Sequence, residues 1–197
     1  MNLFITNFYL FILAVVLAVL EIQIEGQHGW AAKLPTWRPD DQRWYVKLYS
    51  KIMSGKVFTG YHLSMFSFVF LIFHLPYVFG VPLTWSSWLQ TLSLFFFFVV
   101  LWDFLWFVLN PHYPLSSFRR EHIKWHQRWL GVAPVDYYGG LFLSLLCQWP
   151  LVISQQSLAP FGWWFTHLGL FSLETFIVVV FSLYVLKIDN WLGKDSS

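Results

Sequence analysis

The sequence of 197 residues is poor in charge, because Asp, Glu, Lys and Arg make up only 11% of it. Soluble domains carry about 25% charged residues, so this composition excludes an ordinary soluble protein, a disordered chain and a nucleic-acid-binding protein. Cysteine is nearly absent as well. The single Cys147 has no second cysteine to pair with in the chain, and cysteine usage therefore does not indicate a redox compartment.

The sequence is instead rich in apolar and aromatic residues, at 57% and 22%. This composition is typical of a helical membrane protein with aromatic residues at both membrane surfaces. Crossing a bilayer takes about 20 apolar residues, and five stretches come close to or exceed that length. They are Leu3–Ile24, Thr59–Val81, Trp88–Leu109, Tyr138–Ser154 and Trp163–Leu186. We therefore expect an all-α integral membrane protein, a bundle of about five transmembrane helices that forms a single domain over residues 1–197.

The twelve Lys and Arg residues predict the orientation of these helices. All of them fall in residues 33–56, in residues 119–128 or after residue 186, which are on one side of the predicted bundle. The segments on the other side, residues 1–2, 82–87 and 155–162, contain none. Basic residues accumulate in cytoplasmic loops, so we expect the N-terminus outside and the C-terminus in the cytoplasm.

Two amphipathic helices are expected on the cytoplasmic membrane surface. Asp41–Ser54 places apolar residues at helical spacing, with Asp40 or Asp41 as the candidate N-terminal cap and Gly55 as the end. Phe118–Leu130 would place five apolar or imidazole side chains on one helical face. These are Phe118, His122, Trp125, His126 and Trp129.

Acidic and histidine residues indicate where function resides, because ionisable side chains inside a bilayer cost about 2.5–3.5 kcal/mol each. The predicted topology brings most of them to the cytoplasmic leaflet. The candidate metal ligands are Glu25, His28, His62, Asp103, His112, His122 and His126. Additional members of the site would be Glu21, Asn110, Asp136 and Glu174. His74 and His167 lie toward the outer side and are excluded.

Two spacings within this set are typical of metal sites. Glu25 and His28 form a Glu-x-x-His pair, as in carboxylate-bridged di-iron bundles. His122 and His126 form a His-x-x-x-His pair, which on a helix directs two imidazoles at one metal. A tetrahedral zinc ion needs at most four ligands, so seven suit two metal ions. The mixture of imidazole and carboxylate favours iron, with zinc as the alternative.

This combination resembles the integral-membrane non-haem di-iron desaturases and hydroxylases of lipids, which carry histidine boxes. The resemblance implies that His122 and His126 form a box, that His62 is an isolated histidine ligand, and that O2 and a cytoplasmic electron donor take part. The sequence has no His-x-x-His-His box, so Glu25 and Asp103 would replace the missing imidazoles. A lipid or other apolar substrate would contact the aromatic residues near the site. These are Phe66, Trp102, Trp106 and Trp125.

Two other functions remain open at this point. A zinc-dependent hydrolase of a membrane lipid amide or ester would need only three or four of these ligands. A non-enzymatic proton or metal conduit would need polar residues through the full depth of the spans, whereas these gather in one leaflet. Single residues also have structural interpretations: His62 can hold a helix end, His112 can shape a turn, and Asp136 can cap the fourth span.

Overall fold

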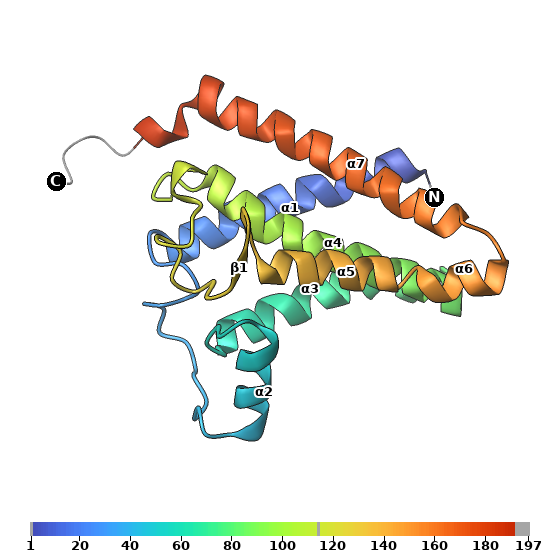
Figure 1. Ribbon diagram of the computed structural model, residues 1–197, viewed down its shortest axis with the longest axis horizontal. Helices are drawn as coiled ribbons and strands as arrows, with labels where there is room; N and C mark the ends of the chain where they lie inside the picture. The colour runs from blue at the N-terminus through green and yellow to red at the C-terminus, as the bar shows by residue number, and fades with distance from the viewer. Residues whose placement is uncertain (1, 114, 192–197) are drawn as a thin grey trace.

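The computed structural model describes residues 2–113 and 115–191, and five long helical segments dominate it (Figure 1). Three are single helices: α1 (Leu3–Glu25), α3 (Gly60–Val78) and α4 (Trp85–Leu109). The fourth consists of α5 (Val135–Leu146) and α6 (Trp149–Gln155), and the fifth of α7 (Ala159–Val180) with a π-helical continuation, η2 (Phe181–Leu186). All five are long and apolar enough to cross a membrane, which confirms the prediction of five such helices.

Local sequence explains where these helices begin. The Asn2 side chain accepts hydrogen bonds from the first backbone N–H groups of α1, and Thr84 forms a capping box with Ser87 at the start of α4. Thr59 caps α3, because its side chain accepts a hydrogen bond from the backbone N–H of His62. Pro150 lies in the first turn of α6, where a proline ring is tolerated, and the helical axis is interrupted just before it.

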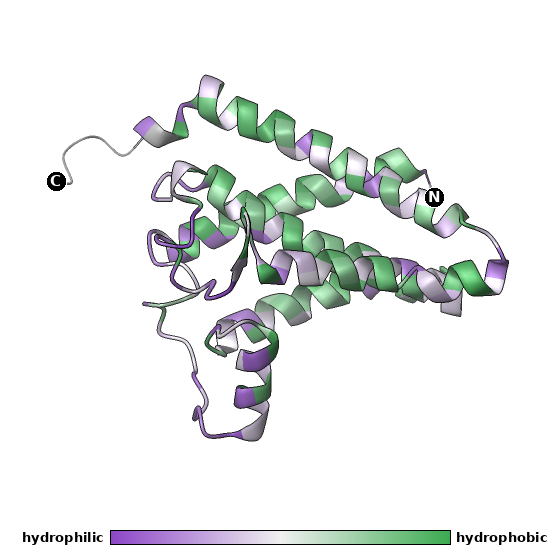
Figure 2. Cartoon of the chain, in the orientation of Figure 1, coloured by the Kyte–Doolittle hydropathy of each residue, from purple (hydrophilic) through white to green (hydrophobic). Residues whose placement is uncertain are grey.

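Helix α4 is the centre of the bundle, with α1 packed on one side and α5 on the other. Ala14 and Ala18 of α1 are fully buried, as are Phe98 and Leu105 of α4. Hydrophobic residues predominate along the long helices, and many of the hydrophilic residues lie in α2 and in the segments at one end (Figure 2). This end, where residues 26–59 and 110–134 meet, is called here the loop-rich end.

A helix forms in the first of these two segments, α2 (Trp44–Ile52), and it is shorter than predicted. Neither predicted aspartate caps it, because Arg43 occupies the N-cap and Asp40 instead accepts a hydrogen bond from the backbone of Gln42. The helix ends at Ile52, Met53 is its C-cap, and Gly55 follows with a φ of +90°. Trp44 and Ile52 are exposed on α2.

The prediction of a second surface helix, over residues 118–130, is wrong. The segment starts after a short 3₁₀ turn, η1 (Leu115–Ser117), and continues as turns into a hairpin of β1 (Trp129–Leu130) and β2 (Ala133–Pro134). The segment buries Ile123 completely, although a helix would rotate this residue about 140° away from Phe118. Tertiary packing of Ile123 and the neighbouring aromatic rings therefore overrides the helical spacing.

Candidate functional site

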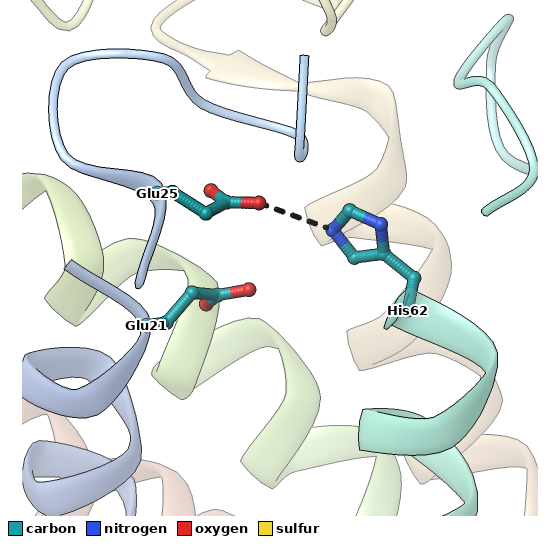
Figure 3. Close-up of side chains that lie close together, drawn as sticks. All are labelled: Glu21, Glu25 and His62. Atoms are coloured by element: carbon teal, nitrogen blue, oxygen red, sulfur yellow. Dashed lines mark ion pairs between the residues drawn. The ribbon is translucent and has the colours of Figure 1, made fainter. Parts of the chain in front are cut away.

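Two glutamates and one histidine meet at the loop-rich end of the bundle. Glu21 and Glu25 lie one turn apart on α1, His62 lies in the first turn of α3, and all three are buried. One ligand atom from each lies within 4.8 Å of the other two, and the side chains face one another (Figure 3). The Nε2 atom of His62 is 3.7 Å from Oε1 of Glu25. We call these three residues the Glu–Glu–His cluster.

Two neighbouring side chains fix the His62 ring. Oγ1 of Thr59, the cap of α3, lies 2.7 Å from Nδ1 of His62. A proton on Nδ1, donated to Thr59, leaves Nε2 unprotonated and directed at the two glutamates, which is the arrangement of a metal-binding imidazole. The Trp30 ring stacks on the imidazole at a centroid distance of 3.8 Å.

The Glu25 carboxylate is held by backbone groups. It accepts hydrogen bonds from the N–H groups of Trp30 and Ala31, the residues of a tight turn just after α1. Both residues have positive φ, at 58° and 51°, and consecutive N–H groups in such a turn form a nest for an anion. The turn therefore fixes the carboxyl group of Glu25 in place without a cationic side chain.

A second group of charged residues surrounds His126 and is called here the His–Asp group. The Nδ1 atom of His126 is 3.2 Å from Asp136, and its Nε2 atom is 3.2 Å from Asp103. The ammonium group of Lys56 lies 3.1 Å from Asp136 and 4.0 Å from Asp103. Tyr137 donates a hydrogen bond to Asp103. One imidazole therefore joins carboxylates of α4 and α5.

A small crevice and a larger cavity connect the two groups. The crevice is lined by Glu21, Glu25, His62 and Asp103 together with Trp106. The larger cavity has a volume of about 530 Å³ and runs between α3, α4 and α5. Its polar end is formed by Glu21, Lys56, His62, Asp103 and Asp136. The remainder of its wall is mostly hydrophobic, so a charged site opens into an apolar space.

The structure brings together four of the seven predicted ligands: Glu25, His62, Asp103 and His126. Two of the predicted additional residues, Glu21 and Asp136, join them. The other three predicted ligands belong to neither group. His112 and His122 are exposed, and His28 is half-buried in the loop after α1. The His122–His126 pair does not face one metal, because the helix that would align the two rings does not form.

The remaining additional residues have structural contacts. The Asn110 side chain donates to the carbonyl of Gly26 and accepts from the backbone of His112, which ties the end of α4 to the loop after α1. Glu174 lies elsewhere, between α1 and α7. Asn7 donates to Glu174 over 2.8 Å, and Oδ1 of Asn7 lies 2.6 Å from Nδ1 of His167.

The four predicted substrate-lining aromatic residues all lie at the site. Phe66 and Trp102 line the larger cavity, and Trp106 and Trp125 line the crevice. The indole N–H groups of Trp102 and Trp106 are buried and have no hydrogen-bond partner among the described residues. Buried N–H donors that lack a partner favour the binding of a ligand with hydrogen-bond acceptor atoms.

Sequence reasoning missed Lys56, Tyr137 and Tyr49. In the sequence, Lys56 is one of several basic residues between the first two predicted spans. Only its position next to the two apolar residues that precede the second span distinguishes it from the others. Tyr49 lines the larger cavity from α2, and its hydroxyl is buried. Its burial, together with the nearby Asp136 carboxylate, raises the pKa of Tyr49, so the hydroxyl keeps its proton at neutral pH.

Comparison of the chain with protein-family models, curated protein sequences and solved structures finds no match. The function is therefore inferred from the site itself.

Proposed function

We propose that this chain is a membrane-embedded, metal-dependent enzyme that acts on a lipid or another apolar substrate, with one divalent ion bound by Glu21, Glu25 and His62. The observation that carries the proposal is the Glu–Glu–His cluster, whose three ligand atoms lie within 4.8 Å of one another in a buried position. Two carboxylates this close repel each other unless a proton or a cation lies between them. An imidazole nitrogen facing the pair favours a metal cation.

The charge of the whole site supports a divalent ion. Four carboxylates, those of Glu21, Glu25, Asp103 and Asp136, are accompanied by one ammonium group, that of Lys56. Uncompensated charge is costly away from water, so the site needs about three further positive charges. A divalent cation would supply two of these charges at once.

Hydrolysis is the reaction that this arrangement supports best. Catalytic zinc sites use three protein ligands and leave one position for water, and the Glu–Glu–His cluster offers three. A bound zinc ion would polarise a substrate carbonyl and acidify water. Asp103 lines the crevice beside the cluster, and His126 contacts both Asp103 and Asp136, so His126 would carry protons between the water and the leaving group by way of Asp103. Water would add across the ester or amide bond of a lipid and release a carboxylic acid with an alcohol or amine.

An O2-using oxidoreductase of the desaturase or hydroxylase type is the second candidate. It is favoured by the apolar cavity, which would bring C–H bonds of a hydrocarbon chain close to Glu21 and His62. It would use iron, O2 and a cytoplasmic electron donor. A second iron would need Asp103, His126 and Asp136 as ligands, but the Lys56 ammonium already contacts both carboxylates. The geometry therefore favours a single metal ion.

We also propose that the loop-rich end faces the cytoplasm. Every Lys and Arg among residues 33–128 lies in a loop or in α2 at that end, and basic residues are retained on the cytoplasmic side. The Glu–Glu–His cluster would then lie in the cytoplasmic leaflet. Helix α2, with exposed Trp44 and Ile52 and basic Lys47 and Lys51, would lie at the membrane surface.

Heavy-oxygen labelling distinguishes the two reactions. The protein is reconstituted with a mixture of phospholipids and fatty-acid amides. It is incubated either in labelled water under air or in ordinary water under labelled O2, and the products are identified by mass spectrometry. Hydrolysis places label from water in a released carboxylic acid and proceeds without O2. Desaturation or hydroxylation requires O2 and an added electron donor.

Glu21→Gln should abolish either product, and Glu121→Gln, a change in an exposed loop, should not. Absence of both products from the metal-replete protein would contradict the proposal.

A further inference from the structure

We infer that the larger cavity receives a hydrocarbon chain of a bilayer lipid through a lateral opening between α3 and α5, and that the missing side chain at Gly139 keeps this opening clear. The inference rests on the proposed function and names the part of the substrate that the apolar wall binds. Four observations support it: the depth of the cavity, its lining, the space at Gly139 and the buried donors at the polar end.

The depth of the cavity suits a chain that starts at the site and extends into the bundle. Asp103 and Phe95 of α4 both line it, and eight residues of helix span about 12 Å. Its volume of about 530 Å³ falls within the roughly 300–1,000 Å³ of typical ligand pockets. Beyond the charged end the wall is mainly aliphatic and aromatic. It includes Phe66, Phe95, Phe96, Val99, Val100 and Leu143. Such a lining binds hydrocarbon and offers nothing to a polar solute.

The opening lies where α5 presents a glycine. Val135, Gly139 and Leu143 line the cavity at successive helical turns, and all three are exposed. A Cβ atom built on Gly139 meets no atom within 4 Å, whereas a Cβ on Gly140 would lie 2.5 Å from a methyl group of Val100. Gly140 is therefore required by the packing of α5 on α4, but Gly139 faces empty space. Ser67, another small and exposed residue, lines the cavity from α3.

The polar end carries donors for the head of the same molecule. Tyr49 and Trp102 both line the cavity, and the Tyr49 hydroxyl and the Trp102 indole N–H are buried and without a partner among the described residues. Ester, amide and phosphate oxygens are acceptors, so these two groups would hold the polar part of a lipid next to the Glu–Glu–His cluster. Ile52 and Met53 also line the cavity.

Photo-crosslinking tests the inference directly. The protein is placed in phosphatidylcholine nanodiscs that contain a small fraction of phosphatidylcholine with a diazirine in the middle of one acyl chain. A second arm uses a free fatty acid with the same group. After illumination, the labelled peptides are mapped by mass spectrometry. We expect labels on cavity residues of α3 and α4, such as Phe66 and Val99, in at least one arm. The arm that gives the label identifies the source of the chain.

Two variants should close the opening from opposite sides. Gly139→Trp and Ser67→Trp should each lower labelling inside the cavity by about tenfold or more, a change equivalent to ~1.4 kcal/mol in chain binding. Gly169→Trp on α7 is the matched control, because Gly169 is also helical, exposed and free of neighbours within 4 Å. It should leave cavity labelling unchanged. Elution profiles matching the wild type establish that each variant is folded.

Cavity labelling that both tryptophan variants leave at the wild-type level would overturn the inference, as would labels confined to the outer faces of α1 and α7. The metal content of the same samples separates this result from the proposed function. Labelled cavities in protein that binds no metal would retain the chain site and contradict the metal site. Stoichiometric metal in protein with an unlabelled cavity would retain the metal site and contradict the chain site.

Discussion

The Nε2 atom of His62 lies 3.7 Å from Oε1 of Glu25, too far for a good hydrogen bond between them. Two ligand atoms that each lie about 2.1 Å from one tetrahedral zinc ion are separated by roughly 3.4 Å. The observed spacing is therefore close to that of two ligands of a shared ion. Helix capping by Thr59 and the backbone turn at Trp30 and Ala31 hold the two side chains in these positions.

His126 should be needed for catalysis and not for metal binding. It lies between Asp103 and Asp136, outside the Glu–Glu–His cluster. Because general acid–base catalysis contributes about 100-fold to 10,000-fold, His126→Ala should lower the turnover rate by at least about 100-fold. Product formation and metal content are measured on the same preparation.

His122 provides the matched control for that change. It is a histidine from the same segment, but its side chain is exposed. His122→Ala should retain both the activity and the metal. Equal losses of activity in the two variants would contradict the assignment of the proton-carrying role to His126.

Lys56 should be important for stability. Its side chain is 4% exposed and pairs with Asp136, and removing one partner of a buried ion pair costs about 3–5 kcal/mol. Lys56→Met should therefore lower the thermal unfolding midpoint in detergent, whereas Lys51→Met on the exposed part of α2 should not. Adding Asp136→Asn to Lys56→Met should recover part of the loss, because one uncompensated carboxylate is then removed. A double variant less stable than Lys56→Met would argue against the pairing.

The orientation can be tested with single cysteines in a Cys147→Ala background. Ser157→Cys lies in the exposed turn between α6 and α7, and Gln42→Cys in the exposed segment before α2. A membrane-impermeant maleimide should label Ser157→Cys on intact cells and Gln42→Cys only after permeabilisation. The opposite pattern would place the Glu–Glu–His cluster in the outer leaflet.

The five long helices were predictable because their signal is local. Each is a long apolar run, and only the break before Pro150 and the π-helical end of the fifth segment modify it. The segment of residues 118–130 was not predictable in this way. Its aromatic residues have helical spacing, but Ile123 is buried by contacts that residues far away in the sequence provide, and such contacts leave no periodic signal.

The site was predicted in part for the same reason. Glu21, Glu25, His62, Asp103 and Asp136 lie on long helices, so topology and helical rise were sufficient to place them at one end. His28, His112 and His122 lie in loops, where spacing along the sequence does not fix direction. His126 also lies in a loop, and it reaches the site because the segment folds inward and not because of its pairing with His122.

Metal content tests the central claim most directly. Protein purified without chelators is analysed for zinc and iron by elemental analysis, alongside His62→Ala and His167→Ala, two variants that each remove a buried histidine. The account predicts close to one ion per chain in the wild type and in His167→Ala, and loss of the ion in His62→Ala, as expected when one of three protein ligands is removed. Active wild-type protein without stoichiometric metal, or metal retained in His62→Ala and lost in His167→Ala, would contradict it.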